Sequence, residues 1–330
     1  MAGAGYRTFQ SGEVLTSNNV QTYLMDQAVQ VYSGTAARAS AVPSPSTGMV
    51  AYSTATGMQV FNGSAWVNVG STGYGVATGG ASTASATISG IDYTILTFTA
   101  TSTLTVTTAG FFDYLMVGGG NGSRFVASAT TGSGGGGAGS LVQGSVYLSA
   151  NQTITIGAGS PTAASSTRFE AGTSSIGTAI YAPGAASSQD NPEYYVGSGS
   201  GTINANAPTA LTNGLGNVGG IGSNSMGGGG GGGFVSAGGA AGASSGGNGG
   251  NGYDVSGFIG GATTYKAAGG GGGVKSGNTP GSAGNGGVAG TTNTTPPSAA
   301  ANSGSGGAGG IGTQTTGNGG SGIAYIRFRS

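Results

Sequence analysis

The run Ile323-Ala-Tyr-Ile-Arg-Phe328 decides the fold, because it has the composition of a β-strand and follows a long glycine-rich region. The stretch 213–322 before it contains 44 glycines in 110 residues. A strand leaves its backbone donors and acceptors unpaired unless it lies beside other strands, so its partners must lie far back in the sequence. We predict that the glycine-rich region, at about 213–322, is an insertion within a β domain and not a loose tail.

The expected partners are five strand-like stretches between residues 91 and 156. Two of them, Ile91–Thr99 and Thr103–Thr107, alternate apolar residues with threonine, which is typical of half-buried strands. Phe111–Val117 is a continuous apolar run and predicts a core strand, and Val142–Leu148 and Gln152–Ile156 complete the set. The sequence therefore predicts a mainly β fold, with a β-sandwich-like domain over residues 91–330 that carries the insertion.

The glycine-rich region itself allows more than one structure. Collagen requires glycine at every third position, and this sequence does not keep that register. A flexible Gly/Ser linker is one alternative. The other is a packed, polyglycine II-like lattice of extended segments, whose backbones approach closely because they lack side chains. The few large apolar residues cannot offset the conformational entropy of ordering so much glycine, so a lattice requires extensive backbone hydrogen bonding.

Residues 1–75 are predicted to form a separate segment that begins with a short helix. Thr16 or Ser17 can cap this helix. Its apolar side chains follow at helical spacing and are Val20, Leu24, Ala28 and Val31, with Tyr23 beside them. This stripe covers one side of the helix, which packs either on its own domain or against a symmetry mate or docking partner.

A small β-meander is expected after the helix. Its three strands are predicted at Met49–Ser53, Met58–Asn62 and Ala65–Val69, with turn signals between them. The last strand contains Trp66, which is the only tryptophan of the chain. Residues 76–90 are rich in glycine, alanine, serine and threonine and indicate a linker to the β domain.

Composition excludes several classes of function. Of the 330 residues 77 are glycine and 5% are charged, with a formal net charge of +0 at pH 7. Histidine and cysteine are absent, which removes disulfides, thiolate metal sites and the commonest general base. The scattered cations form no basic patch for nucleic acid, and no apolar run approaches the ~20 residues of a membrane span. We therefore expect no cofactor, no metal, no nucleic-acid partner and no membrane insertion.

Acidic residues offer the only route to catalysis. Two carboxylates suffice for glycoside hydrolysis, and Asp190 and Glu193, beside two tyrosines, are the best pair. A solvated loop is the simpler interpretation, and neither this pair nor Asp254 has the clustered oxygens that calcium requires. The GxGxxG matches follow from composition and lack the strand and helix of a nucleotide site. The sequence therefore predicts a binding or structural protein and not an enzyme.

The chain resembles proteins of bacteriophage tails in two parts. Residues 1–70 resemble the N-terminal segment of tail-fibre and minor tail proteins through pieces that occur in the same order, namely Tyr6–Thr16, Val20–Met25, Ala36–Ser40, Pro45–Tyr52 and Phe61–Trp66. The later part resembles the glycine-rich domain common in phage tail fibres through Phe112–Gly120, Gly134–Gly139 and Gly319–Phe328. Together the two resemblances cover most of the chain.

The resemblance implies a virion protein of the tail, a tail fibre or minor tail protein, that attaches through its N-terminus and presents its glycine-rich domain to the host. Some phage adhesins of similar composition pack polyglycine segments into a sandwich whose exposed loops touch the host. The small N-terminal segment and the trimeric state common among such fibres lead us to expect a homotrimer. Tyr23, Leu24 and Trp66 are expected to dock to neighbouring tail or baseplate proteins.

Host recognition is expected on side chains that interrupt the glycine tracts, because a uniform backbone carries little information. The candidates are Phe234, Tyr253, Phe258 and Tyr265. Exposed aromatic residues are typical interface anchors, and the two tyrosines carry hydroxyls suited to a host glycan or outer-surface protein. The sequence leaves open the alternative that these aromatics form the core of the insertion.

Two further functions stay open from the sequence. One is a head fibre or capsid-decoration protein, and the other is a non-viral glycine-rich structural or ice-binding protein, against which the separate N-terminal segment argues. The start, Met1-Ala-Gly-Ala-Gly-Tyr-Arg7, lacks the basic-then-apolar layout of a secretory signal. A virion protein made in the host cytoplasm is therefore the expectation.

Overall fold

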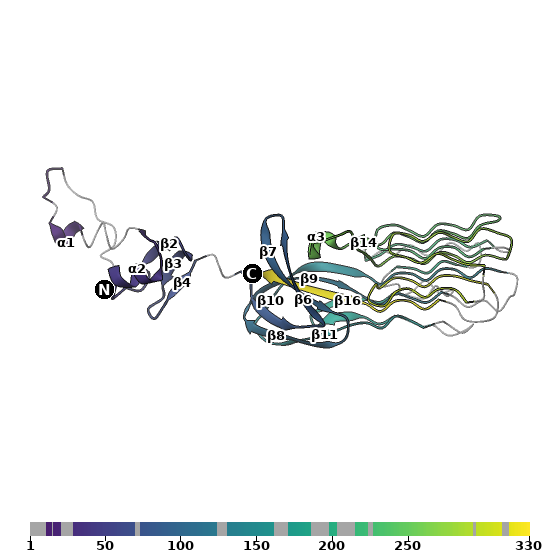
Figure 1. Ribbon diagram of the computed structural model, residues 1–330, viewed down its shortest axis with the longest axis horizontal. Helices are drawn as coiled ribbons and strands as arrows, with labels where there is room; N and C mark the ends of the chain where they lie inside the picture. The colour runs from purple at the N-terminus through teal and green to yellow at the C-terminus, as the bar shows by residue number, and fades with distance from the viewer. Residues whose placement is uncertain are drawn as a thin grey trace. The chain divides into compact units, whose positions relative to one another are not determined.

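The computed structural model describes residues 11–14, 16–20, 29–69, 73–123, 131–161, 171–185, 198–202, 215–223, 227–292, 295–311 and 317–330. The chain divides into two compact units, Met1–Tyr74 and Gly75–Ser330, whose helices and strands are labelled in Figure 1. Each unit has β-sheets of its own, so the fold is mainly β, as the sequence predicts.

The first unit contains a four-stranded sheet. Its strands are β1 (Gln30–Tyr32), β2 (Val50–Ser53), β3 (Gly57–Phe61) and β4 (Trp66–Asn68), in the order β1-β2-β3-β4. Strands β2, β3 and β4 pair antiparallel through short turns, which confirms the predicted meander. In the second turn the Asn62 side chain accepts hydrogen bonds from the backbone N–H groups of Ser64 and Ala65, a local pairing that favours turns.

The predicted N-terminal helix is wrong at its C-terminal end. Helix α1 comprises Ser17–Val20, and Val31 lies in β1, which pairs parallel with β2. The β-branched side chain of Val31 favours a strand. Val31 was assigned to the helix only because its spacing from Val20, Leu24 and Ala28 matches a helical repeat. Tyr23, Leu24 and Ala28 lie outside the described residues.

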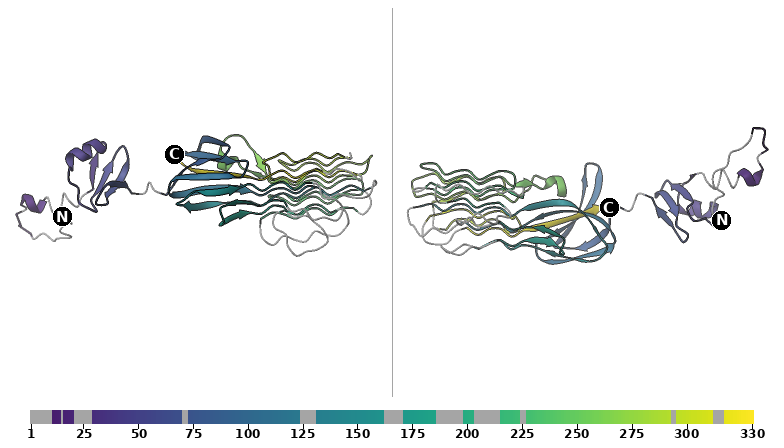
Figure 2. Two further views of the ribbon diagram at one scale, coloured as in Figure 1. Left: turned by 90° about the horizontal axis from the view of Figure 1, so that it is seen from below. Right: turned by 180° about the vertical axis from the view of Figure 1, so that it is seen from behind.

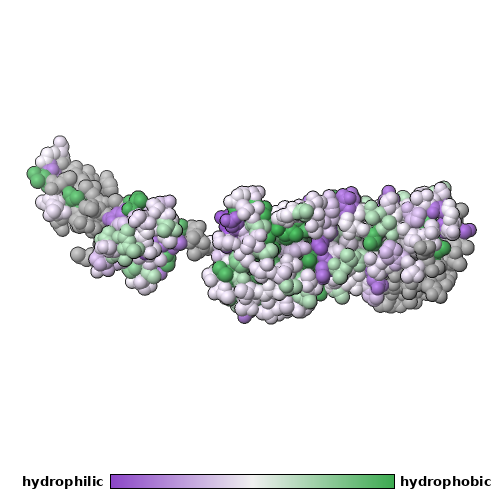
Figure 3. All heavy atoms as spheres, in the orientation of Figure 1, coloured by the Kyte–Doolittle hydropathy of each residue, from purple (hydrophilic) through white to green (hydrophobic). Residues whose placement is uncertain are grey.

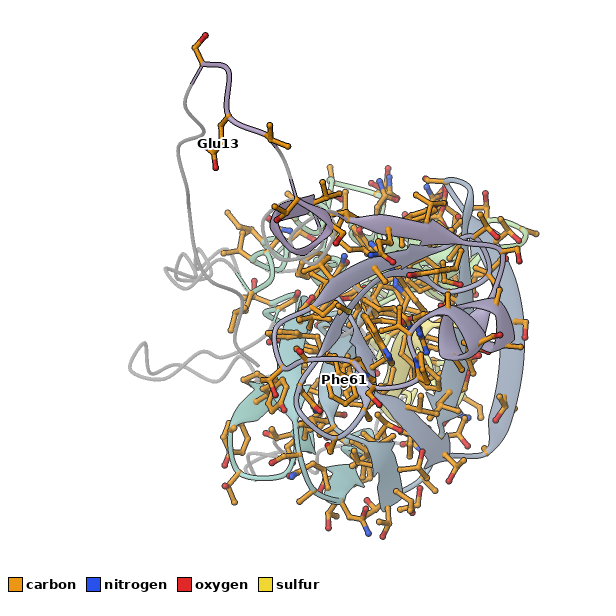
Figure 4. All side chains as sticks on the ribbon, turned by 90° about the vertical axis from the view of Figure 1, so that its left-hand side faces the viewer. Glu13 and Phe61 are labelled. Carbon is orange, nitrogen blue, oxygen red and sulfur yellow. The ribbon has the colours of Figure 1, made fainter. Side chains whose placement is uncertain are left out.

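One face of this sheet is covered by α2 (Thr35–Ala41), a helix that the sequence analysis missed. Its sequence is TAARASA, rich in alanine, which has the highest helix propensity. Arg38 of α2 lies over Trp66, with its Cζ atom 4.6 Å from the ring centroid. Trp66 also packs against Phe61, at 5.7 Å between ring centroids. Figure 4 labels Phe61 on this sheet and Glu13 on a chain segment that lies apart from it.

The second unit is built on two five-stranded sheets. The first sheet has the order β10-β9-β16-β7-β6, with β6 (Ser82–Ile88), β7 (Ile91–Phe98), β9 (Gly110–Val117), β10 (Leu141–Leu148) and β16 (Ile323–Arg329). The second has the order β13-β12-β11-β8-β5, with β5 (Val76–Gly79), β8 (Ser102–Thr108), β11 (Gln152–Thr155), β12 (Ser174–Ile176) and β13 (Ile180–Ala182). The strands predicted between residues 91 and 156 are all present.

The last strand, β16, lies in the middle of the first sheet, between β7 and β9. Its residue Arg327 is paired with Asp113, 214 positions earlier. Residues 323–326 are buried without interruption, as expected of a central strand covered on both faces. The glycine-rich region is therefore enclosed between strands of one sheet.

Residues 76–90 are not a linker, and that prediction is wrong. They contain β5 and β6, which pair antiparallel with β8 and β7. Strand β6 is an edge strand with mostly exposed side chains, so its serine and threonine residues give no apolar signal. The tight turn at Ser89 and Gly90, with φ values of 52° and 78°, joins β6 to β7 in the way a two-residue hairpin requires.

The two sheets pack face to face around large side chains and form a β-sandwich. Phe112 from the first sheet and Leu104 and Ile154 from the second are all fully buried. Phe112 packs against Phe328 with their ring centroids 5.7 Å apart. Burial of such side chains is the principal stabilising contribution in a sandwich of this kind.

Three excursions leave the sandwich and together form a bundle of glycine-rich segments. They join β9 to β10, β11 to β12, and β13 to β16, and the third contains β14 (Tyr253–Asp254), α3 (Ser256–Ile259) and β15 (Tyr265–Lys266). The segments run side by side away from the sandwich (Figures 1 and 2). The bundle also uses residues 118–123 and 131–140, so it extends beyond the predicted insertion at 213–322.

Candidate binding surface

The backbone hydrogen bonds of the glycine bundle repeat every three residues. In segment 228–233, successive N–H groups donate to three different neighbouring segments, and every third group returns to the same neighbour. Gly228 and Gly231 donate to the carbonyls of Gly273 and Gly270 on one neighbour. Gly229 and Gly232 donate to those of Thr202 and Gly199 on a second neighbour, and Gly230 and Gly233 donate to those of Gly239 and Ser236 on a third. All six hydrogen bonds are 2.8–2.9 Å long. A three-residue turn is that of the polyproline II helix and not of a β-strand, so these segments are polyglycine II-like.

Neighbouring segments of the bundle run in both directions. Gly135 and Ala138 donate to Gly229 and Gly232 of a parallel segment, and Gly136 and Gly139 donate to Gly307 and Gly304 of an antiparallel one. A segment that bonds to neighbours on several sides builds a three-dimensional lattice, whereas a sheet strand bonds to two neighbours at most. The flexible-linker interpretation is therefore wrong for the described glycine-rich segments.

The interior of the lattice has no room for side chains. A Cβ atom added to Gly231 lies 1.8 Å from the carbonyl oxygen of Gly136, and one added to Gly270 lies 2.1 Å from that of Gly307. Real Cβ atoms essentially never approach another heavy atom within 3.0 Å. Because the obstructing atoms are backbone, they cannot rotate away, and the close approach itself requires glycine.

The outer end of the bundle, opposite the sandwich, carries two described turns. From Ser140, beside β10, back to Gly132 the segment extends about 25 Å at a rise of ~3.1 Å per residue. The turns 242–245 and 275–279 lie side by side at this end, where the N–H of Thr279 donates to the carbonyl of Ser244 at 3.1 Å. These two turns are called the outer turns.

The outer turns present small polar side chains and a cation. Ser244, Lys275, Ser276 and Thr279 are exposed, and Lys275 is the single charged residue of these two turns. Hydroxyl and ammonium groups donate hydrogen bonds to oxygen-rich ligands. Elsewhere on the face drawn in Figure 3, the second unit is mostly pale, between hydrophilic and hydrophobic. The sequence analysis missed the outer turns, because a lone lysine in a Gly/Ser tract carries no periodic signal.

Phe258, one of the predicted receptor contacts, lies at the base of the bundle and not on its surface. It is 3% exposed on α3. It belongs to a cluster of buried residues that joins the bundle to the sandwich and includes Tyr93, Leu115, Val117, Val255, Ile323 and Tyr325. The prediction of a receptor contact at Phe258 is therefore wrong, because a glycine-rich insertion uses its few apolar residues to anchor itself.

Of the other three predicted receptor residues, two lie against the same cluster. Phe234 and Tyr253 pack against it, and their rings meet edge to face at 5.8 Å between centroids. Tyr265 is half-buried on β15, where it pairs with Asp254. The alternative left open by the sequence, that these aromatics form a core, describes Phe234 and Tyr253.

Arg327 ties the base of the bundle to the sandwich. Its Nε donates to the Asp113 carboxylate at 3.3 Å, and its Nη1 donates to the carbonyl oxygen of Phe258 at 2.9 Å. The guanidinium also lies over two rings, with Cζ 4.3 Å from the centroid of Tyr93 and 4.2 Å from that of Phe258. One side chain on β16 therefore contacts β9, β7 and α3.

Asp254 organises the turn that leads into α3. Its carboxylate accepts hydrogen bonds from the backbone N–H groups of Ser256 and Thr264, both at 3.0 Å. These bonds, first that from Ser256 and then that from Thr264, hold the pKa of Asp254 below its ordinary value of 3.8. The oxygens are thus engaged by the loop, which gives Asp254 a structural role.

Lys266, the next cation along the chain, faces inward. Its Nζ donates to the carbonyl oxygen of Asn302 at 2.7 Å. Burial lowers the pKa of Lys266 from its ordinary value of 10.5, because a charged amine loses hydration there. Lys266 therefore helps to hold the third excursion together, whereas Lys275 is exposed at the outer end.

The predicted attachment residues of the first unit are not brought together in the described part of the chain. Trp66 is half-buried between Arg38 and Phe61, so its described contacts are internal. Tyr23 and Leu24 lie outside the described residues. The structure therefore assigns Trp66 a packing role within its own unit.

The described residues hold no grouping of three or more Asp, Glu, His or Cys side chains of the kind that binds a metal ion. Asp190 and Glu193, the predicted alternative for catalysis, lie outside the described residues. No helix in the described part of the chain has both the length and the apolar character needed to cross a membrane.

These features define a class of protein, a β-sandwich extended by a side-chain-free polyglycine bundle. A family described as "Glycine-rich domain" matches residues 96–329, most of the second unit. The chain therefore belongs to the glycine-rich domain family. None of the curated proteins compared with the chain matches it.

Proposed function

We propose that this chain is a virion structural protein of a phage tail, a tail fibre or minor tail protein, that attaches through its first unit and binds the host surface with its glycine-rich unit. The resemblances of residues 1–70 and of the glycine-rich part support the tail assignment. The observation that carries host binding is the lattice, which ends in exposed polar turns.

The bundle suits binding because it holds the outer turns in place. Each described glycine segment is hydrogen-bonded to several neighbours, so the turns extend from a rigid support. A preorganised surface loses little conformational entropy when it binds, and this favours affinity. The interior of the lattice offers no side chains for recognition, so specificity falls to its ends.

The chemistry of the outer turns favours a host glycan or an acidic outer-surface protein as the ligand. Ser244, Ser276 and Thr279 offer hydroxyls, and Lys275 offers an ammonium group. These groups hydrogen-bond to sugar hydroxyls or to carboxylates without any reaction step. The proposal therefore describes an adhesin and not an enzyme.

The position of the chain is tested by labelling phage particles that carry it. A gold-labelled antibody against the second unit is expected to mark the tail in electron micrographs. Label on the head would instead assign a head fibre or capsid-decoration protein. Particles that carry no label, with the antibody active on the purified chain, would contradict the virion assignment.

Host binding is tested with the full chain, fluorescently labelled, on the bacteria that the phage infects. Lys275→Glu is expected to reduce adsorption at least tenfold, whereas Arg329→Glu, an equal change of charge on the sandwich, leaves adsorption unchanged. Equal adsorption of all three proteins would contradict binding at the outer turns. Release of new reducing ends from host polysaccharide would show that the chain is a hydrolase and not only an adhesin.

A further inference from the structure

The sheet of the first unit has an apolar face that nothing in the described chain covers. Pairing across the strands places Val31 beside Tyr52 and Tyr52 beside Met58, and Val69 donates its N–H to the carbonyl of Met58 at 2.7 Å. Two residues away, Val60 lies opposite both Val50 and Val67. Because side chains alternate along a strand, one face of the sheet carries only Val31, Val50, Tyr52, Met58, Val60, Val67 and Val69, which we call the apolar face.

Most of the apolar face is exposed to solvent. Val31 is 68% exposed, and Tyr52, Met58, Val67 and Val69 range from 40% to 49%. The opposite face carries the residues on which α2 packs, among them Trp66, and its Ser53 and Gln59 side chains are buried. The unit thus buries two polar side chains on this face, while apolar side chains on the other face are exposed.

This arrangement is unfavourable for an isolated unit. Ala51 is the single buried apolar residue among the described residues of the first unit, and the chain has no cysteine to form a disulfide. A unit of this size, Met1–Tyr74, buries only a modest fraction of its surface and is marginally stable on its own. A contiguous exposed apolar patch on a soluble protein marks an interface.

The absence of charge indicates what covers the face. Within residues 29–69 the sole charged side chain is Arg38, which lies on the opposite face over Trp66. An uncharged face offers nothing to a charged partner, because complementary charge is what selects such partners. A second copy of this chain, in contrast, brings an equally apolar and uncharged face.

We infer that the apolar face packs against the same face of further copies of this chain. Sheets that pack face to face lie about 10 Å apart with their side chains interdigitated, and this covers the residues that the single chain exposes. The inference concerns self-association and stands whether or not the chain belongs to a phage tail. The sequence predicted a homotrimer without locating its interface, and the inference assigns self-association to the apolar face, opposite the side of the sheet that carries Trp66.

The experiment measures the mass of the full chain by analytical ultracentrifugation over a range of concentrations. The wild type is expected to be larger than a monomer, and Tyr52→Lys with Val31→Lys is expected to reduce it to a monomer of 30.9 kDa. Ala36→Lys with Ala37→Lys, which adds the same two charges at exposed positions on α2, is the control and should leave the mass unchanged.

Fluorescence of Trp66 separates loss of association from loss of folding, because this single tryptophan lies on the covered face. Its emission should be the same in the oligomer and in the monomeric double variant. A monomeric wild type at the highest concentration overturns the inference. A Tyr52→Lys, Val31→Lys variant that keeps the oligomeric mass also overturns it. So does a result in which this variant and the α2 control variant both lose the oligomeric mass and both change their emission.

Discussion

The sandwich and the glycine bundle of the second unit solve the packing problem in opposite ways. In the sandwich, Phe112, Leu104 and Ile154 fill the space between two sheets, and backbones stay apart because side chains separate them. In the bundle, carbonyls and Cα atoms of neighbouring segments meet directly, as at Gly231 and Gly136. The first interior is stabilised mainly by apolar area and the second by backbone hydrogen bonds.

This difference determines which changes each region tolerates. The sandwich is damaged when atoms are removed, because a cavity remains. The bundle is damaged when atoms are added, because no side chain can move aside. In the bundle, the residues that maintain the fold are different from those available for recognition. Substitutions within the lattice disturb folding, and only the turns at its ends are free to vary.

The largest effect is expected from Phe112→Ala in the sandwich. Phe112 is fully buried and packs on Phe328, so its truncation leaves a large cavity and costs about 3–5 kcal/mol of unfolding free energy. Phe111→Ala, one position away, is the control, because Phe111 is 47% exposed and should cost about 1 kcal/mol or less. Chemical denaturation measures both, and equal losses would contradict the assignment of the two faces of β9.

The matching test of the bundle adds one carbon atom at Gly231. Gly231→Ala places a Cβ atom 1.8 Å from a backbone oxygen and should cost about 3 kcal/mol, at the upper end of measured overpacking. Gly257→Ala is the control, because a Cβ there meets nothing within 4 Å and alanine favours the helix α3. Thermal unfolding of the two variants measures the difference. If Gly231→Ala is as stable as the wild type, the lattice is not as closely packed as described.

An intermediate effect is expected where the two regions join. Arg327→Met removes the ion pair with Asp113, the hydrogen bond to Phe258 and two ring contacts, and should cost about 2 kcal/mol, because the pair is neither fully exposed nor fully buried. Arg329→Met, at an exposed position on the same strand, should cost less than Arg327→Met, because interactions at exposed positions contribute less to stability. Proteolysis in the β14–β15 region should increase for Arg327→Met alone, and equal proteolysis of both variants would show that Arg327 does not hold that region.

The sandwich could be predicted from sequence because its strands carry local signals. Alternating threonine and apolar residues marked β7 and β8, and the final apolar run marked β16. Strands β5 and β6 gave no such signal, because an edge strand does not need an apolar face. The sequence allowed a lattice but did not distinguish it from a linker, since the difference lies in hydrogen bonds between segments far apart in the chain.

The candidate site was predicted less well, for a related reason. Aromatic residues in a glycine tract suggested exposed anchors. Phe258 and Phe234 instead pack in or against the buried cluster beside the sandwich, because burial of their apolar rings is favourable. The outer turns carry only small polar residues and Lys275, which no pattern distinguishes from other Gly/Ser tracts. The apolar face of the first unit was hidden because Val31 fitted a helical spacing, and only strand pairing places it beside Tyr52.

The smallest effect is expected from a change of pH at the turn before α3. The backbone N–H groups of Ser256 and Thr264 favour the ionised carboxylate of Asp254, so its pKa is lower in the folded chain than in the unfolded one. This stabilisation is fully present above the ordinary pKa of 3.8 and is lost as the pH falls through the folded value. Asp254→Asn should therefore lower Tm slightly at pH 7, and the gap to the wild type should close at about pH 2. A gap of the same size at both pH values would mean that the charge of Asp254 does not stabilise the turn.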